Sequence, residues 1–187
     1  EFIDAKIDEI KSKNNNLHVQ RFKIKSLYEM YKNDEDLLLE MVKSSLDKIK
    51  LIHPKLRDEL LADYLYINKN ILGKGVRMRI THTYRSPEEQ HKLFLQRPKV
   101  TNADSWQSIH NYALAFDITI LLDKNNDGVF EAVSWDLKAD NDKDVIADWM
   151  EVVRYLKSKG WTWGGDWKNF PDNPHFEKTD YTWKTLK

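Results

Sequence analysis

Apolar residues recur with two different periods along this chain of 187 residues. Between Leu37 and Ile49 they return every three or four positions, which predicts an amphipathic helix. A second helix is expected to begin at His53-Pro54, because proline suits the first helical turn, and to end at Gly73 or Gly75. Five apolar side chains are expected to line one face of this helix: Leu56, Leu60, Tyr64, Ile67 and Ile71.

After the second helix the pattern changes to alternation. Apolar and polar side chains alternate over residues 76–81, which is typical of a β-strand. A helix over 87–96 should follow, because Ser86 and Glu89 can form a capping box around a proline at the first helical position. The segment 97–107 is expected to be a loop.

The second half of the chain reads mainly as strands. Two apolar runs, 115–122 and 129–134, flank the turn sequence Asp-Lys-Asn-Asn-Asp-Gly, which predicts a β-hairpin. A last helix over 144–159 and a short strand around His175-Phe176-Glu177 complete the pattern. Helices followed by antiparallel strands predict an α+β fold, a small antiparallel sheet flanked by helices. The buried stripe of the last helix is predicted to be Ile146, Trp149, Val153 and Leu156.

Length and composition indicate one main domain. Residues 51–187 are long enough to bury a full core, and residues 1–50 are predicted to form a helical N-terminal extension. Lys+Arg and Asp+Glu balance at 30 each, so no net charge favours nucleic acid or an anionic membrane. The chain has no cysteine, which excludes disulfides and thiolate metal ligands. No apolar run is long enough to span a membrane; no signal peptide is visible, although the missing initiator Met leaves a removed leader open.

Two separate motifs carry the candidate chemistry, Ser108-Ile-His110-Asn-Tyr-Ala-Leu-Ala-Phe-Asp117 and Asp172-Asn-Pro-His175. A catalytic zinc site needs three protein ligands and keeps a fourth position open for water. His110, Asp117 and His175 can supply these ligands, and Asp172 is then placed to handle the proton of the water. Since histidines are more often packed or at the surface, that simpler assignment is given to the other four: His18, His53, His82 and His91.

Taken in order, these residues resemble a family of zinc peptidases that cut peptidoglycan stem peptides. That family contains D-alanyl-D-alanine carboxypeptidases and dipeptidases and L-alanyl-D-glutamate endopeptidases, including phage endolysins. The resemblance covers roughly residues 54–180 and implies the fold that these peptidases share with the hedgehog signalling domain. Besides the two motifs above, it rests on Thr83-Tyr84-Arg85-Ser86-x3-Gln90, Gly160-Trp-Thr-Trp-Gly-Gly-Asp-Trp167 and Pro174-His-Phe-Glu177.

The resemblance also implies roles for individual residues. One zinc ion per chain would be held by His110, Asp117 and His175, with Asp172 carrying the proton of the attacking water to the departing amine. Arg85 would anchor a substrate carboxylate or stabilise the oxyanion, tasks that suit a planar charged guanidinium; a surface or capping arginine is the alternative. Four further side chains are expected to touch substrate or to support the ligands from outside: Ser108, Gln90, Glu177 and Trp163.

Two positions depart from the family pattern. The family usually has glycine three residues after the first ligand, where this chain has Ala113, and glycine before Tyr-Arg, where it has Thr83. If Ala113 adopts a positive φ, the strain costs on the order of 1 kcal/mol. Neither departure changes a predicted ligand.

A rival motif lies in the predicted hairpin. Asp123-x-Asn125-x-Asp127-Gly128 matches the first half of a calcium loop, with oxygen donors at alternate positions and glycine at the sixth. The twelfth position is Ser134, where a bidentate glutamate would be expected, and the flanks read as strands. A plain hairpin turn is therefore favoured, with calcium only as a structural site.

The sequence leaves three functions to compare. The main expectation is a zinc endopeptidase that cuts the L-Ala–D-Glu bond of peptidoglycan stem peptides, acting as a monomer in the cell wall, outside the cytoplasm. A D-Ala-D-Ala carboxypeptidase or dipeptidase on the same scaffold is the alternative. A non-catalytic wall-binding module is disfavoured, because all three ligands and the carboxylate base are present. The Trp-Gly-Gly-Asp-Trp sequence at 163–167 favours the endopeptidase by resemblance alone.

Overall fold

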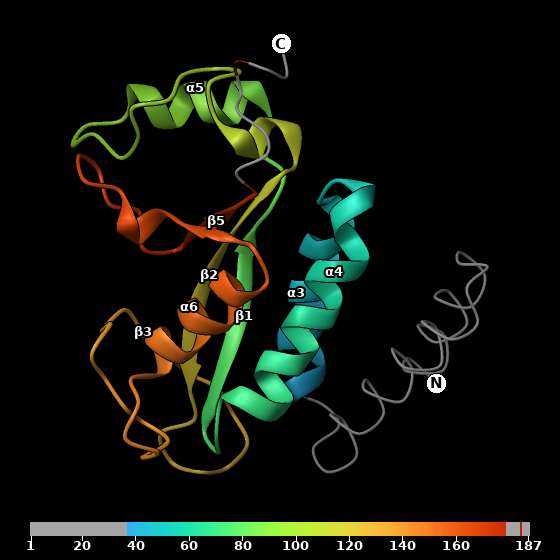
Figure 1. Cartoon of the computed structure of the whole chain (residues 1–187), viewed down its shortest axis with the longest axis vertical. Helices are drawn as coiled ribbons and strands as arrows, with labels where there is room; N and C mark the ends of the chain where they lie inside the picture. Colours follow the sequence, from blue (N-terminus) through green and yellow to red (C-terminus); the bar gives the residue numbers. More distant parts are fainter. Residues whose placement is uncertain (1–36, 179–183, 185–187) are drawn as a thin grey trace.

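A computed structural model describes residues 37–178 and 184, which form an antiparallel sheet with helices packed around it (Figure 1). The strands follow the order β1-β2-β5-β4, and β3 pairs with the free half of β2. This arrangement confirms the predicted α+β class. The strands are β1 (Val76–His82), β2 (Ala115–Leu122), β3 (Ala132–Ser134), β4 (Thr162–Trp163) and β5 (His175–Glu177).

The helices begin close to the positions that the capping signals predict. In α5 the Ser86 hydroxyl accepts from the Glu89 N–H, and the Glu89 carboxylate accepts from the Ser86 N–H, so the capping box is formed. The second predicted helix is also confirmed, although its last turn is a π-helix, η1, over Ile67–Ile71. The α-helices are α3 (Leu37–Leu51), α4 (Pro54–Tyr66), α5 (Pro87–Leu95) and α6 (Asp148–Ser158).

Helix α3 and η1 cover the outer edge of β1. The Ser45 hydroxyl accepts from the Ile80 N–H at 3.2 Å, and the side-chain oxygen of Asn68 accepts from the Met78 N–H at 2.8 Å. The Asn68 amide also donates to the Met78 carbonyl at 3.2 Å. An uncovered strand edge would present unpaired backbone groups, so these side chains replace a missing neighbour strand. A domain boundary at residue 50 remains a prediction; the expected helices before residue 37 lie outside the described residues.

Helix α6 starts at Asp148, so the prediction that it begins at residue 144 is wrong. The Asp140 carboxylate accepts from the N–H groups of Asp144 and Val145, and Val145 has a φ of 82°, which holds this segment in a turn. Ile146 is consequently 36% exposed, whereas the other three predicted members of the buried stripe are buried. The sequence also missed the two-residue strand β4, and β3 is shorter than the apolar run that predicted it.

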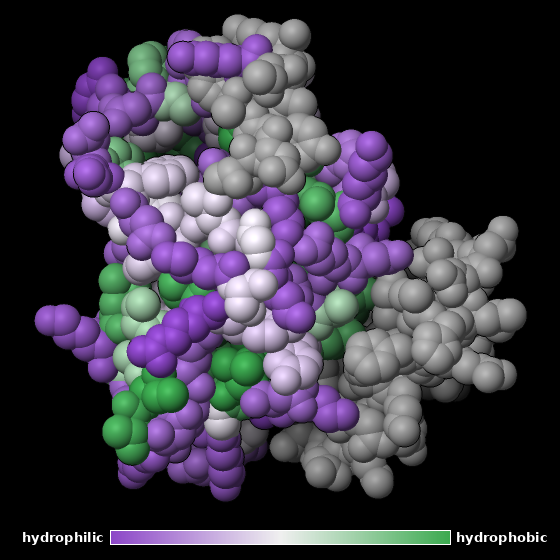
Figure 2. Space-filling model, viewed as in Figure 1, coloured by the Kyte–Doolittle hydropathy of each residue, from purple (hydrophilic) through white to green (hydrophobic). Residues whose placement is uncertain are grey.

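The core lies between the sheet and the helices. Phe116 of β2 packs edge-on against Trp161 and stacks on Phe176 of β5, with ring centroids 4.8 and 5.5 Å apart. On the face shown in Figure 2, hydrophilic residues predominate and hydrophobic residues form only small patches. Within the described residues, none of the helices has the length and apolar character needed to cross a bilayer.

Ala113, which stands where the family usually has glycine, adopts the left-handed conformation, with φ 58° and ψ 32°. We expect Ala113→Gly to stabilise the fold by about 0.5–1 kcal/mol, because glycine reaches this region without a Cβ clash. Thermal unfolding should show a Tm higher by about 1–4 °C. Ala115→Gly is the matched control: Ala115 is buried in β2 without a positive φ, so the same substitution there should lower Tm.

Candidate metal centre

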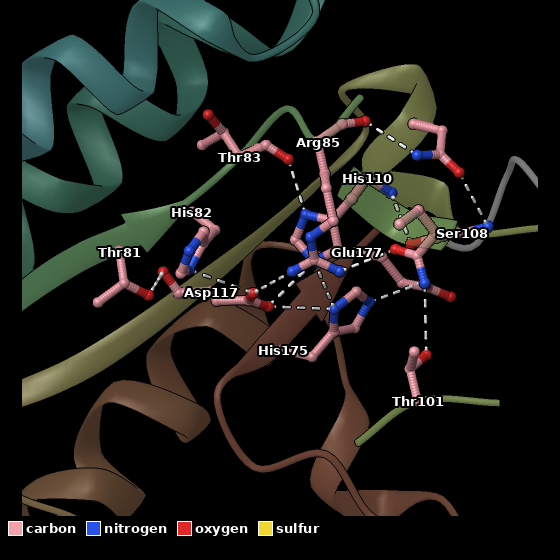
Figure 3. Close-up of polar contacts among 12 residues, drawn as sticks. Thr81, His82, Thr83, Arg85, Thr101, Ser108, His110, Asp117, His175 and Glu177 are labelled. Atoms are coloured by element: carbon pink, nitrogen blue, oxygen red, sulfur yellow. Dashed lines mark hydrogen bonds and ion pairs between the residues drawn. The ribbon is translucent and has the colours of Figure 1, made fainter. Parts of the chain in front are cut away.

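The three predicted ligands come from three separate elements and meet at one end of the sheet (Figure 3). Asp117 lies on β2, and antiparallel pairing places it directly opposite His175 of β5. His110 lies on the short 3-10 helix η2 (Ile109–Tyr112), which comes just before β2. The sheet register therefore fixes two ligands, and a short helical turn fixes the third.

The three donor atoms converge within hydrogen-bonding distance of one another. Nε2 of His110 lies 3.0 Å from Oδ1 of Asp117 and 3.1 Å from Nδ1 of His175. Nδ1 of His175 lies 3.3 Å from the same Asp117 oxygen. Zinc bonds of about 2.0–2.1 Å in a tetrahedron place ligands roughly 3.3 Å apart, so the observed separations fit one zinc ion.

The outer nitrogen of each imidazole makes a hydrogen bond that decides whether the inner nitrogen carries a proton or a lone pair. His110 Nδ1 lies 2.7 Å from the Thr83 carbonyl oxygen, and His175 Nε2 lies 2.9 Å from a carboxylate oxygen of Glu177. Both partners can only accept, so in each neutral ring these nitrogens carry the proton and the inward nitrogens offer lone pairs. Two lone pairs and a carboxylate oxygen thus face a common point, which suits a cation.

The electrostatics of the centre also favour a cation. Burial alone would raise the pKa of Asp117, but the imidazoles of His110 and His175 outweigh it and hold the pKa well below its ordinary value. Burial lowers the pKa of His175, yet its hydrogen bonds to Asp117 and Glu177 prevail and raise the pKa to about 9. Both shifts show that the surroundings of the three side chains favour positive charge, which a metal ion bound there would supply.

Arg85 reaches the centre from the segment between β1 and α5. Its Nη2 donates to Oδ2 of Asp117 at 3.4 Å, the oxygen that does not face the imidazoles. Its Nη1 donates to the side-chain carbonyl of Gln90 at 3.0 Å, and Gln90 is fully buried in α5. Its backbone N–H donates to the His110 carbonyl at 3.1 Å. Gln90 thus orients the guanidinium, and Arg85 lies beside the ligands.

Ser108 shapes the turn that carries His110, the first predicted ligand. Its hydroxyl accepts from the His110 N–H at 3.3 Å, and its N–H donates to the Asn111 side chain at 3.4 Å, a capping box for η2. The Asn111 amide donates to the Arg85 carbonyl at 2.9 Å. The cap therefore joins the ligand turn to the segment that positions Arg85.

Asp172 lines the cleft beside the ligands but is not a member of the converging set. Burial and the negative charge of Asp117 raise the pKa of Asp172, which eases protonation of its carboxyl group. Its N–H donates to the Gly164 carbonyl at 3.0 Å, and a Cβ on Gly164 would lie only 2.5 Å from the Asp172 carbonyl oxygen. A glycine is therefore needed just after β4, where the backbone of Asp172 approaches closely.

The cleft at the metal centre has a volume of about 540 Å³. Arg85, Ser108 and Glu177 contribute to its lining, whereas Trp163 is buried and donates its indole N–H to the Asn173 carbonyl at 2.7 Å. The tryptophan in the lining is Trp167, whose ring centroid lies 5.1 Å from that of His175. Sequence reasoning did not single out several other lining residues, namely Thr101, Asn102, Ala103, Gln107 and Phe170.

His82, which is expected to be a packed or surface residue, also lies near the centre. Its Nδ1 is 3.9 Å from Oδ2 of Asp117, and the two residues are register partners in β1 and β2. The side chain is 57% exposed, so it borders the centre from the solvent side. Alternation along β1 could have indicated this position only if the β1–β2 register had been known.

Comparison with known proteins agrees with the motifs. Residues 101–178 match a family model described as D-alanyl-D-alanine carboxypeptidase, a range that contains the three converging ligands and Asp172. The chain is 41% identical over 110 residues to the peptidoglycan L-alanyl-D-glutamate endopeptidase CwlK of Bacillus subtilis strain 168, and the alignment covers 56% of this chain and 62% of that relative.

A solved structure is also similar. The L-Ala D-Glu endopeptidase ChiX of Serratia marcescens superimposes with a TM-score of 0.49 at 19% sequence identity, covering 73% of this chain and 86% of that one. The family match and the sequence identity to the Bacillus endopeptidase confirm the resemblance to peptidoglycan peptidases that the motifs predicted.

Proposed function

We propose that the protein is a zinc-dependent peptidoglycan hydrolase that cuts the L-Ala–D-Glu bond of stem peptides. The observation that carries the proposal is the convergence of two imidazole lone pairs and one carboxylate oxygen at a single point in the cleft. Similarity to CwlK supports the choice of bond. Zinc bound there would polarise the scissile carbonyl and lower the pKa of water toward neutrality.

Asp172 performs the proton transfer in this mechanism. Its carboxyl takes a proton from the attacking water and then gives it to the amine that leaves. A base that later acts as an acid works best with a pKa closer to neutrality, and burial moves the pKa of Asp172 in that direction. No serine or cysteine nucleophile is needed, because the water attacks the carbonyl directly.

Arg85 binds negative charge at the reacting end of the substrate. Its guanidinium is held by Gln90 and lies next to Asp117, so it is oriented before substrate arrives. The D-Glu α-carboxylate would lie beside an L-Ala–D-Glu cut, within the class of groups that a guanidinium binds through two parallel hydrogen bonds.

The alternative function is a D-Ala-D-Ala carboxypeptidase or dipeptidase, which the description of the matching family favours. Mass spectrometry of purified muropeptides after digestion distinguishes the two, because the new termini identify the bond. Release of a free N-terminal D-Glu supports the endopeptidase; release of D-Ala supports the carboxypeptidase. Intact muropeptides with zinc-loaded protein would favour the third candidate, a non-catalytic wall-binding module.

The proposed setting follows from the substrate. We place the enzyme in the cell wall, outside the cytoplasm, as a secreted or phage-released hydrolase that acts as a monomer. Its balanced charge, with 30 basic and 30 acidic residues, gives no reason to expect nucleic acid as a partner. The macromolecular partner is therefore the peptidoglycan stem peptide.

The role of Arg85 can be tested with a thermodynamic cycle that combines substitution of Arg85 with amidation of the substrate carboxylate. We expect Arg85→Lys to impair cleavage clearly, because it keeps the charge but loses the planar fork. Amidation of the D-Glu α-carboxylate in a synthetic stem peptide should weaken wild-type cleavage by roughly 1.5–3 kcal/mol of lost interaction, and should change little further in Arg85→Ala. The measured quantity is kcat/KM for the four combinations.

Arg154→Lys is the matched control, because Arg154 is exposed on α6 and does not line the cleft. Zinc content is measured in every variant, since Arg85 also touches Asp117. Independent, multiplicative losses from the variant and the amidation would show that Arg85 does not bind this carboxylate, leaving oxyanion stabilisation or positioning of Asp117.

A further inference from the structure

A second cluster of carboxylates lies away from the cleft, where the chain enters α6. One oxygen from each of Asp140, Asp142 and Asp148 lies within 4.8 Å of the others, and the same holds for Asp142, Asp144 and Glu151. Asp142 belongs to both groups, so five carboxylates share one small region. All five come from a single stretch, residues 140–151.

Two oxygens in this cluster are buried and have no partner. Oε2 of Glu151 and Oδ1 of Asp142 each expose less than 1 Å², and neither has a hydrogen-bond donor within the described part of the chain. Asp148 is only 1% exposed, and its carboxylate accepts from the backbone and side-chain N–H groups of Asn141. A buried carboxylate oxygen without a donor or counter-charge is costly, so these oxygens indicate a missing positive group.

Protein cations do not supply that charge. Across residues 37–178 and 184, no lysine or arginine forms an ion pair with any of the five carboxylates. The five carboxylates therefore have no protein counter-charge within the described part of the chain.

The spacing of the five carboxylates identifies the class of cation. Counted from Asp140, they occupy the first, third, fifth, ninth and twelfth positions, which are side-chain ligand positions of a calcium loop, with a glutamate at the twelfth. Val145 at the sixth position has the positive φ, 82°, that such loops usually give to glycine. Glu151 lies in the first turn of α6, as the last ligand lies on the exiting helix of a calcium loop.

We propose that residues 140–151 form a calcium site, with Asp140, Asp142, Asp144 and Glu151 as side-chain ligands and Asp148 next to the ion. The site does not depend on the proposed peptidase activity. Asp142 also accepts from the Gly73 N–H at 2.6 Å through its other oxygen, Oδ2. Calcium bound to Asp142 would therefore stabilise the contact between the loop before α6 and the segment that leads into β1.

The hairpin turn at Asp123–Gly128 is the alternative location for calcium. Its Asp123 carboxylate accepts from the N–H groups of Asp127 and Gly128, the same arrangement that Asp140 makes in the second loop. It lacks the glutamate at the twelfth position, and in the described region none of its carboxylates joins a cluster of three. The second loop is therefore the better calcium site.

The experiment measures calcium binding by calorimetry and Tm on the full, zinc-loaded chain. Wild-type protein should bind about one calcium ion and show a higher Tm with millimolar calcium, with a smaller effect of magnesium. Glu151→Gln and the exposed Asp144→Asn should each weaken calcium binding at least about tenfold. Glu88→Gln, an exposed change on α5, is the matched control and should bind calcium as wild type does.

Two results would overturn the proposal. The first is a wild-type protein that binds no calcium at millimolar concentration. The second is calcium binding that persists in both loop variants but disappears in Asp127→Asn, which would place the ion in the hairpin turn. Glu151→Gln keeps the size and shape of the side chain and introduces no charge, so it should fold, and its calcium-free Tm checks that it does. Hydrolysis of muropeptides is not needed for any of these measurements.

Discussion

Asp172→Ala should retain its zinc and lose at least about a hundredfold in the rate of stem-peptide cleavage. The carboxyl lines the cleft but is not one of the three groups whose donor atoms converge, so removing it leaves the ligand set intact. Burial and the charge of Asp117 already disfavour its ionised form, so the variant should also fold without a large loss of stability. Zinc analysis and kcat on a defined muropeptide test both parts.

Asp166→Ala is the matched control for this experiment. Asp166 lies in the same loop region, but it is exposed and pairs with Lys157 on α6, away from the cleft. Its removal should change kcat little. If Asp172→Ala loses zinc, or cleaves at nearly the wild-type rate, the roles of Asp172 and Asp117 have been exchanged.

The elements that build the centre could be predicted because their signals are local. The capping box at Ser86 fixes the start of α5, and alternation fixes β1, so the segment carrying Arg85 between them was also fixed. The pairing of Asp117 with His175 depends on the β2–β5 register, which joins residues far apart in sequence. The residue types and the family resemblance predicted that both side chains bind one metal, but neither predicted this register.

The parts that the sequence missed depend on contacts across loops. Residues 101–103 line the cleft because Gln90 holds the Ala103 carbonyl at 2.7 Å, a bond that no periodicity shows. Trp163 and Trp167 look equivalent in the motif, yet β4 pairing turns the first inward and leaves the second on the cleft. No local sequence pattern predicts the direction of a side chain at the end of a two-residue strand.

The proposed calcium loop at 140–151 is hard to predict for a related reason. The hairpin turn matches the calcium pattern because it has glycine at the sixth position, whereas residues 140–151 have Val145 there, and their apolar spacing predicts a helix from residue 144. The φ of 82° at Val145 shows that the backbone adopts the loop conformation without glycine. The ligand spacing was therefore more informative than the turn residue.

His110→Ala and His175→Ala should each abolish stoichiometric zinc binding and, with it, hydrolysis. Each variant removes one of three protein ligands, and in each the partner that oriented the ring, Thr83 or Glu177, is left without its hydrogen bond. Zinc per chain, measured after dialysis, should fall from about one to near zero. Circular dichroism should show that the secondary structure is kept, because both rings lie at one end of the sheet, outside the hydrophobic core.

His91→Ala is the matched control for the zinc measurements, because His91 is an exposed imidazole on α5 that pairs with Asp104, outside the ligand set. It should keep one zinc per chain. Added zinc should raise the Tm of wild type and of His91→Ala by the same amount, since an ion that binds only the folded state stabilises it by mass action. The Tm of the two ligand variants should not respond at the same zinc concentration. Full zinc occupancy in both His110→Ala and His175→Ala would refute the assignment of the metal centre.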